Sequence, residues 1–102
     1  MNAQADMMAA VRASYRQKLL DRLIGIENAS VVLDQNAEDA DALGLIRREC
    51  HKLSGVSTSL GFPEIGEMAT EIDCAITLEN KPWADVRDRV ESLLDLMEEQ
   101  LD

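Results

Sequence analysis

The sequence predicts an all-α fold, an antiparallel four-helix bundle with a short additional N-terminal helix. Apolar residues recur at helical spacing in four segments joined by short loops, and no segment shows the strict alternation of a half-buried strand. The 102 residues are 46% hydrophobic but include only one Trp, one Tyr and one Phe. The core must therefore be aliphatic, which suits helix packing, and the chain has the length of a single domain.

The first long helix is expected to begin at Ser14, because Ser14 and Gln17 fit a capping box. Residues 3–12 are predicted to form a short separate helix with a frayed start. We therefore divide the chain into a partly helical N-terminal segment, residues 1–13, and a four-helix bundle, residues 14–102. The core-facing stripe of the first bundle helix contains Tyr15, Leu19, Leu23, Ile26, Ser30 and Leu33.

Three further helices follow in the chain. The linker "NAEDAD", residues 36–41, places acids where the second helix begins, and these complement the positive end of its dipole. After Gly61, Pro63 is suited to the first turn of a third helix. The segment "NKP" then breaks the chain, and residues 83–101 form the clearest amphipathic helix. The core-facing arc of the second helix is predicted to hold Leu43, Ile46, Cys50, Leu53, Ser57 and Leu60.

Composition excludes several classes of function. A net charge of −10 argues against a general nucleic-acid binder, which needs Lys and Arg to neutralise phosphates. No run approaches the roughly 20 apolar residues of a membrane span, and the start lacks the regions of a signal peptide, so we expect a cytoplasmic protein without a membrane anchor. The predicted outward apolar surface is too small to require a dimer, so we expect a monomer. Cys50 and Cys74 are too few and too far apart for a zinc site or a disulfide framework, and we expect them reduced and packed.

The only histidine, His51, lies outside the predicted core arc of the second helix. It points roughly 140° from the centre of that arc and should be largely in solvent. Gly55, one turn later, lacks the Cβ that would shield the imidazole, at a cost of about 1 kcal/mol in helix propensity. The surface around His51 is predicted to contain Arg48, Gly55, Thr58 and, if the helix persists, Phe62, with Arg47 and Ser54 on one flank and Lys52 on the other.

The stretch "HKLSGVSTSLGF", residues 51–62, resembles the signature H-x-L-[K or small]-G-x-[A/S]-x-x-x-G-[A/F] of histidine-containing phosphotransfer (Hpt) domains. The resemblance extends over roughly residues 14–100 in helix pattern and length. It implies a four-helix bundle whose exposed histidine accepts a phosphoryl group from a receiver-domain aspartyl-phosphate and passes it to another receiver. By position, His51 is the phosphoacceptor and Gly55 lets the partner approach, whereas Ser54 stands where many members have Lys.

The chemistry of the chain agrees with this resemblance. An exposed imidazole offers a lone pair at physiological pH, and phosphoryl transfer needs chiefly positioning and charge stabilisation. No ligand cluster accompanies His51, so we expect no cofactor in this chain and Mg²⁺ in the partner receiver domain. The sequence shows neither a Gly-rich nucleotide loop nor a general base paired with the histidine. We therefore expect a phosphoryl carrier without kinase activity of its own, whose partner-binding residues are Arg47, Arg48, Lys52, Ser54, Gly55, Thr58 and Phe62.

Two other interpretations remain open. The bundle could bind receivers or kinases without being phosphorylated, in which case His51 would carry no acid-labile phosphate. It could also be the phosphoacceptor domain of a chemotaxis-type histidine kinase, although the chain contains no ATP-binding or dimerisation segment. A metal-binding bundle is weaker, because one histidine and no Glu-x-x-His pair leave too few ligands.

Overall fold

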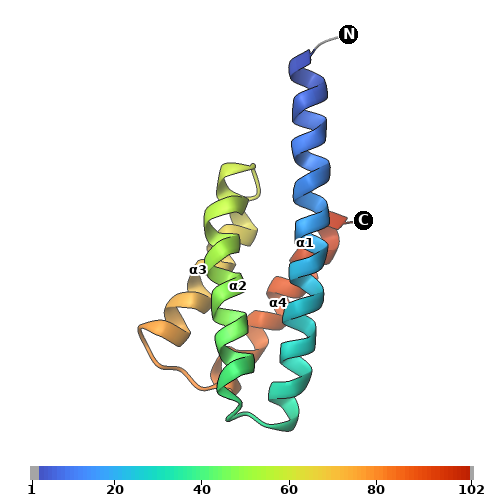
Figure 1. The fold of residues 1–102 in the computed structure, drawn as a ribbon. Coiled ribbons are helices and arrows are strands. Elements are labelled where there is room, and N and C mark those ends of the chain that lie inside the picture. Colours follow the sequence, from blue (N-terminus) through green and yellow to red (C-terminus); the bar gives the residue numbers. More distant parts are fainter. Residues whose placement is uncertain (1–2, 102) are drawn as a thin grey trace.

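Residues 3–101 fold into four helices: α1 (Ala3–Gln35), α2 (Ala40–Ser59), α3 (Pro63–Thr77) and α4 (Trp83–Leu101). The structure is a computed structural model that describes residues 3–101, so residues 1 and 2 of the predicted N-terminal segment, and residue 102 of the predicted bundle, lie outside the described residues. Successive helices run in opposite directions and each packs on its neighbours in the chain, with α4 returning to α1 (Figure 1). The predicted all-α antiparallel bundle is confirmed.

The predicted helix start at Ser14, and the separate short helix before it, are wrong. Helix α1 is continuous over 33 residues, because the segment from Ala3 to Ser14 contains no Gly or Pro and is rich in Ala and other helix formers. A capping box marks a helix start only where the preceding chain leaves the helix. Every side chain from residue 3 to residue 14 is exposed, and this part of α1 projects past the other helices (Figure 1). Burial begins at Tyr15.

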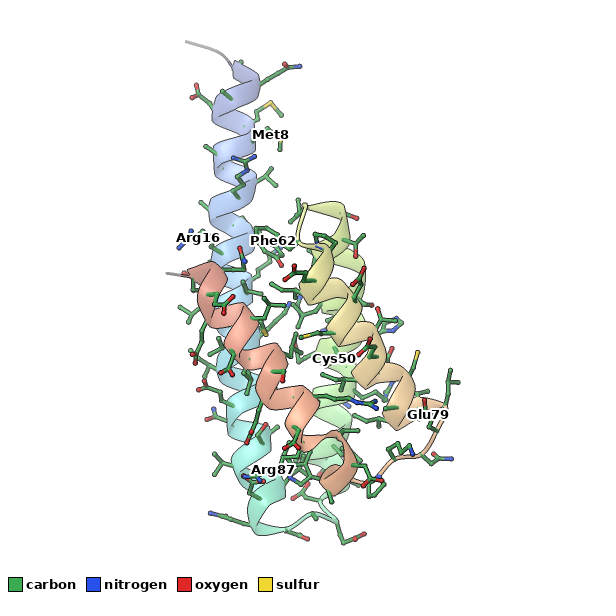
Figure 2. All side chains as sticks on the ribbon, turned by 180° about the vertical axis from the view of Figure 1, so that it is seen from behind. Met8, Arg16, Cys50, Phe62, Glu79 and Arg87 are labelled. Carbon is green, nitrogen blue, oxygen red and sulfur yellow. The ribbon has the colours of Figure 1, made fainter. Side chains whose placement is uncertain are left out.

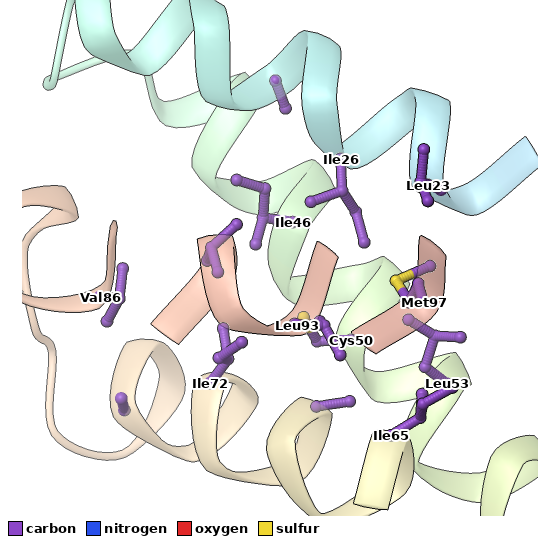
Figure 3. Close-up of a cluster of buried hydrophobic side chains, with 14 of the residues drawn as sticks. Leu23, Ile26, Ile46, Cys50, Leu53, Ile65, Ile72, Val86, Leu93 and Met97 are labelled. Atoms are coloured by element: carbon purple, nitrogen blue, oxygen red, sulfur yellow. The ribbon is translucent and has the colours of Figure 1, made fainter. Parts of the chain in front are cut away.

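The core lies along the central axis of the bundle and is built from aliphatic side chains of all four helices (Figure 3). The predicted arc of α2 is confirmed, since four of its members are buried and Leu43 and Leu60 are half-buried against them. The largest fully buried side chains are Leu19, Ile26, Leu33, Ile46, Leu53, Ile65, Ile72, Leu93, Met97, Val86, Val90 and Cys50.

One end of the bundle is held by aromatic and hydroxyl contacts of α1 with the last turn of α2 and the residues that follow it. The Tyr15 and Ser57 hydroxyls form a buried hydrogen bond of 2.9 Å, and burial is the main cause that raises the pKa of Tyr15. Gly61 adopts a φ of 87° and ends α2, so the helix does not persist to Phe62. The Phe62 ring instead stacks on Tyr15 with centroids 5.1 Å apart, and it is half-buried. Figure 2 shows Phe62 at this end of the bundle, on the side toward α1.

Helices α2 and α3 make the most extensive contact in the bundle, and Gly66 permits their close approach. A Cβ at Gly66 would overlap Thr58 Oγ1 and would lie 3.4 Å from the carbonyl oxygen of Ser54. The Thr58 hydroxyl also donates to that carbonyl oxygen, over 3.2 Å. Thr58, which the sequence placed on the outward side of α2, is exposed but contacts α3.

The other end is held by Asp34 in the last turn of α1, which accepts hydrogen bonds from two residues of α4. Trp83 Nε1 donates to Oδ1 over 2.9 Å, and Arg87 Nε donates to the same oxygen over 2.9 Å. Arg87 Nη2 reaches Oδ2 at 3.3 Å. The hydrogen bond from Trp83, followed by that from Arg87, lowers the pKa of Asp34. These contacts connect the two helices that are most distant in the chain.

The lowered pKa of Asp34 predicts a stability term that depends on pH. A carboxyl group whose pKa is lower in the folded chain stabilises it above the unfolded pKa, and this contribution is lost as pH falls from about 4 through the folded value. Asp34→Asn should lower the melting temperature at pH 7, and the difference from wild type should shrink on acidification. Thermal unfolding followed by circular dichroism between pH 7 and pH 2.5 measures this, with Asp95→Asn, an exposed carboxyl on α4, as control. A difference that stayed constant over this range would contradict the assignment.

The two glycines near the α2–α3 contact should respond oppositely to alanine. A Cβ at Gly55 would have no heavy atom within 4 Å, so Gly55→Ala should raise the free energy of unfolding by up to about 1 kcal/mol through helix propensity. Gly66→Ala should lower it by about 1 to 2 kcal/mol, because the new methyl group overpacks the helix contact. Adding Thr58→Ala to Gly66→Ala should recover part of the loss. Urea unfolding gives the free energy of unfolding of wild type, the two single glycine variants and the double variant. Equal changes in this free energy for Gly55→Ala and Gly66→Ala would refute the packing argument.

Candidate functional site

His51 lies in the middle of α2, on the side of the helix that faces solvent. Its side chain is 74% exposed, which confirms the outward orientation predicted from the helical wheel. The residues that hold this part of α2 in place are Cys50 and Leu53, both fully buried in the core. The imidazole is therefore an exposed group on a firmly packed helix.

The imidazole is contacted by a carboxylate from the neighbouring helix. His51 Nδ1 and Asp73 Oδ2 of α3 lie 2.9 Å apart, and the Asp73 side chain is only 18% exposed. Asp73 was not among the predicted site residues, and no general base paired with the histidine was expected. A signal was present: Asp73 is the only charged residue between Glu71 and Glu79, on the flank of an otherwise apolar segment of α3. An acid in such a segment needs a polar partner.

This contact distinguishes the two ring nitrogens of His51. An ionised carboxylate only accepts hydrogen bonds, so Nδ1 must carry the proton that Asp73 accepts. In the neutral ring, Nε2 then holds the free lone pair. The site consequently presents a nucleophilic nitrogen on an exposed ring, while the other nitrogen is anchored to α3.

The Asp73 carboxylate has a second partner on its own helix. Thr77, the last residue of α3, donates its hydroxyl to Asp73 Oδ1 over 3.0 Å. The two carboxylate oxygens are thus used separately, Oδ1 by Thr77 and Oδ2 by His51. Three side chains form a hydrogen-bonded row across the α2–α3 surface, from Thr77 through Asp73 to the imidazole.

The residues predicted beside His51 fall into two groups. Ser54 and Gly55 follow it by three and four positions on α2; Gly55 is exposed, and Ser54 is half-buried with its hydroxyl donating to the His51 carbonyl oxygen over 2.7 Å. Arg48 and Lys52 are also exposed. Arg47 is half-buried. These residues flank His51 along α2, but the Arg48 guanidinium lies beside Gly44, and the Ser54 hydroxyl bonds the His51 backbone rather than its ring.

Thr58 and Phe62 differ from that group. Thr58 packs against Gly66 of α3, two turns of helix from the imidazole. Phe62 lies beyond the end of α2 and stacks on Tyr15 of α1, so it does not share the outward sector of His51. The end of α2 at Ser59 is the physical reason, since the helical wheel no longer applies to residues after Gly61.

Other groups with reactive potential do not join this site. Both cysteines are free thiols; Cys50 is buried, and burial raises the pKa of its thiol to about 12, so it stays protonated. Within residues 3–101, no group of three or more His, Cys, Asp or Glu side chains is arranged to hold a metal ion. None of the helices described is both long and apolar enough to cross a bilayer.

Comparison with known proteins identifies the family of this chain. The family model of the Hpt domain matches residues 6–102. The comparisons with curated proteins and with solved structures found no match. The match covers nearly the whole chain, and the fold is the helical bundle that this family adopts. The chain therefore belongs to the Hpt domain family, the histidine phosphotransfer modules of phosphorelays.

Proposed function

We propose that His51 accepts a phosphoryl group from the aspartyl-phosphate of one receiver domain and passes it to the aspartate of another. The observation that carries this proposal is the exposed imidazole with Nδ1 bonded to Asp73, in a chain of the Hpt family. The partners are receiver domains of response regulators or hybrid histidine kinases. The chain itself acts as carrier and has no kinase activity.

The transfer step follows from the assignment of the two nitrogens. The Nε2 lone pair attacks the phosphorus, and the Nε2–P bond forms as the bond from phosphorus to the receiver's aspartate oxygen breaks. The electron pair of that bond remains on the aspartate carboxylate. Asp73 keeps the Nδ1 proton in its hydrogen bond and offsets the positive charge that develops on the ring. Transfer to the second receiver is the same step in reverse.

The receiver supplies what this chain does not. We expect the Mg²⁺ that neutralises phosphoryl oxygens to be held by the receiver's own acidic residues. Gly55 leaves space beside His51, so a partner surface can approach the imidazole closely. We further propose a cytoplasmic monomer, in which the receiver contacts are made by Arg47, Arg48, Lys52, Ser54, Gly55, Thr58 and Phe62.

The proposal is tested by following label from a phosphorylated receiver. Wild-type protein should take up acid-labile, base-stable label, and His51→Gln should take up none, because no other histidine exists in the chain. Its melting temperature should remain close to that of wild type, since the His51 side chain is mostly exposed. Label that is acid-stable, or that persists in His51→Gln, would refute the assignment. Receiver binding without any labelling of wild type would instead support an interaction-only module.

Gly55 provides a separate test of docking. Gly55→Leu should slow transfer from the receiver by roughly tenfold or more, because the new side chain displaces the partner from the reactive geometry. Gly55→Ala is the matched control: it changes the same position by one carbon and should retain most of the rate. Single-turnover transfer rates at several receiver concentrations separate weaker docking from slower chemistry. Equal rates for the Leu, Ala and wild-type proteins would remove Gly55 from the contact surface.

A further inference from the structure

We propose that Thr77 is a positioning residue for His51 and acts through Asp73. Its hydroxyl holds the Asp73 carboxylate in the orientation that fixes the imidazole tautomer with the proton on Nδ1 and the lone pair on Nε2. The consequence for transfer rests on the proposed function of His51, whereas the effect on the tautomer is a property of the unphosphorylated chain.

The geometry requires something to orient Asp73. The terminal torsion of an Asp side chain is broad, so a carboxylate with one partner can rotate and offer either oxygen. Here Oδ2 lies 2.9 Å from His51 Nδ1 and Oδ1 accepts from Thr77 over 3.0 Å. Two partners on opposite oxygens fix the plane of the carboxylate. Thr77 is four positions after Asp73, the spacing at which side chains meet on a helix surface.

Thr77 is itself held in place at the end of α3. Its β-branched side chain has few rotamers. The backbone around it is closed by hydrogen bonds from Leu78 N to the Cys74 carbonyl oxygen and from Lys81 N to the Ala75 carbonyl oxygen, each 2.9 Å. Asn80 makes the left-handed turn after the helix, with a φ of 51°. The hydroxyl therefore projects from an ordered helix terminus.

The imidazole depends on this row because little else orients it. With 74% of its side chain exposed, His51 has few packing contacts to select one ring orientation. The hydrogen bond from Nδ1 to Asp73 is the polar contact that distinguishes the two nitrogens. If Asp73 rotates, the ring loses its preference for the tautomer with Nε2 free. The hydroxyl of Thr77 is at the surface, where water competes with it, so its removal should weaken the preference and not abolish it.

The test uses Thr77→Val, which removes the hydroxyl and keeps the branched shape, and Thr77→Ser, which keeps the hydroxyl. Thr70→Val is the matched control: Thr70 lies on the same helix, but its hydroxyl donates to the Gly66 carbonyl oxygen over 2.8 Å. Asp73→Ala removes the carboxylate and gives the reference values for an imidazole without this hydrogen bond. Nitrogen-15 chemical shifts of the His51 ring, recorded on the unphosphorylated protein at a pH where the ring is neutral, report the tautomer populations directly.

Thr77→Val should shift these populations from the Nδ1–H form toward the Asp73→Ala values, while Thr77→Ser and Thr70→Val retain the wild-type values. Single-turnover transfer to His51 should slow by roughly threefold to tenfold in Thr77→Val, the range expected for one modest hydrogen bond. Ring shifts in Thr77→Val that match wild type would overturn the inference, as would an equal change in Thr70→Val or no recovery in Thr77→Ser. If wild type accepts no phosphoryl group, the proposed function fails, but the ring shifts still decide the role of Thr77.

Discussion

The candidate site depends on how closely α2 packs against α3. Aspartate has a short side chain, so Asp73 can reach the imidazole at 2.9 Å only if the two helix backbones are near each other. Gly66 makes that approach possible, because any larger residue there would meet Thr58 of α2. A wider separation of the two helices would leave the half-buried Asp73 carboxylate with Thr77 as its partner but without the imidazole, and losing that hydrogen bond is unfavourable. The contact between Asp73 and the imidazole therefore depends on helix packing some two turns away.

The two ends of the bundle give the exposed histidine a rigid base. At one end Tyr15 bonds Ser57, and at the other Asp34 receives hydrogen bonds from α4. Between these ends α2 is held by fully buried side chains. The core therefore fixes the backbone at His51 but not the torsions of its side chain. Phosphoryl transfer relies on positioning, and here the backbone is positioned by the core while the ring is positioned by Asp73. The hydrogen bond from Asp73 allows the ring to be exposed and still held in one orientation.

Local periodicity was sufficient to predict the fold class, the buried stripes and the outward orientation of His51, because each depends on spacing within one helix. The role of Gly66 and the contact of Asp73 could not be predicted in this way, since both depend on which helices are neighbours and how far apart they lie. The predicted break at Ser14 failed for another reason. A capping box does not start a helix where the preceding residues are themselves helical. Phe62 was expected in the outward sector only if the helix persisted, and α2 ends at Ser59, before it.

The run of small residues after His51 serves three faces of α2 at once. Gly55 points to solvent and leaves open space, Ser57 points inward to the Tyr15 hydroxyl, and Thr58 points sideways to α3. Such residues weaken a helix, but hydroxyls at positions 54, 58 and 59 donate to carbonyl oxygens one turn earlier in the same helix. The segment therefore has a low helix propensity because small residues occupy three positions that face different sides of α2. At Gly55, by contrast, a Cβ would have no heavy atom within 4 Å, so packing does not account for the glycine there.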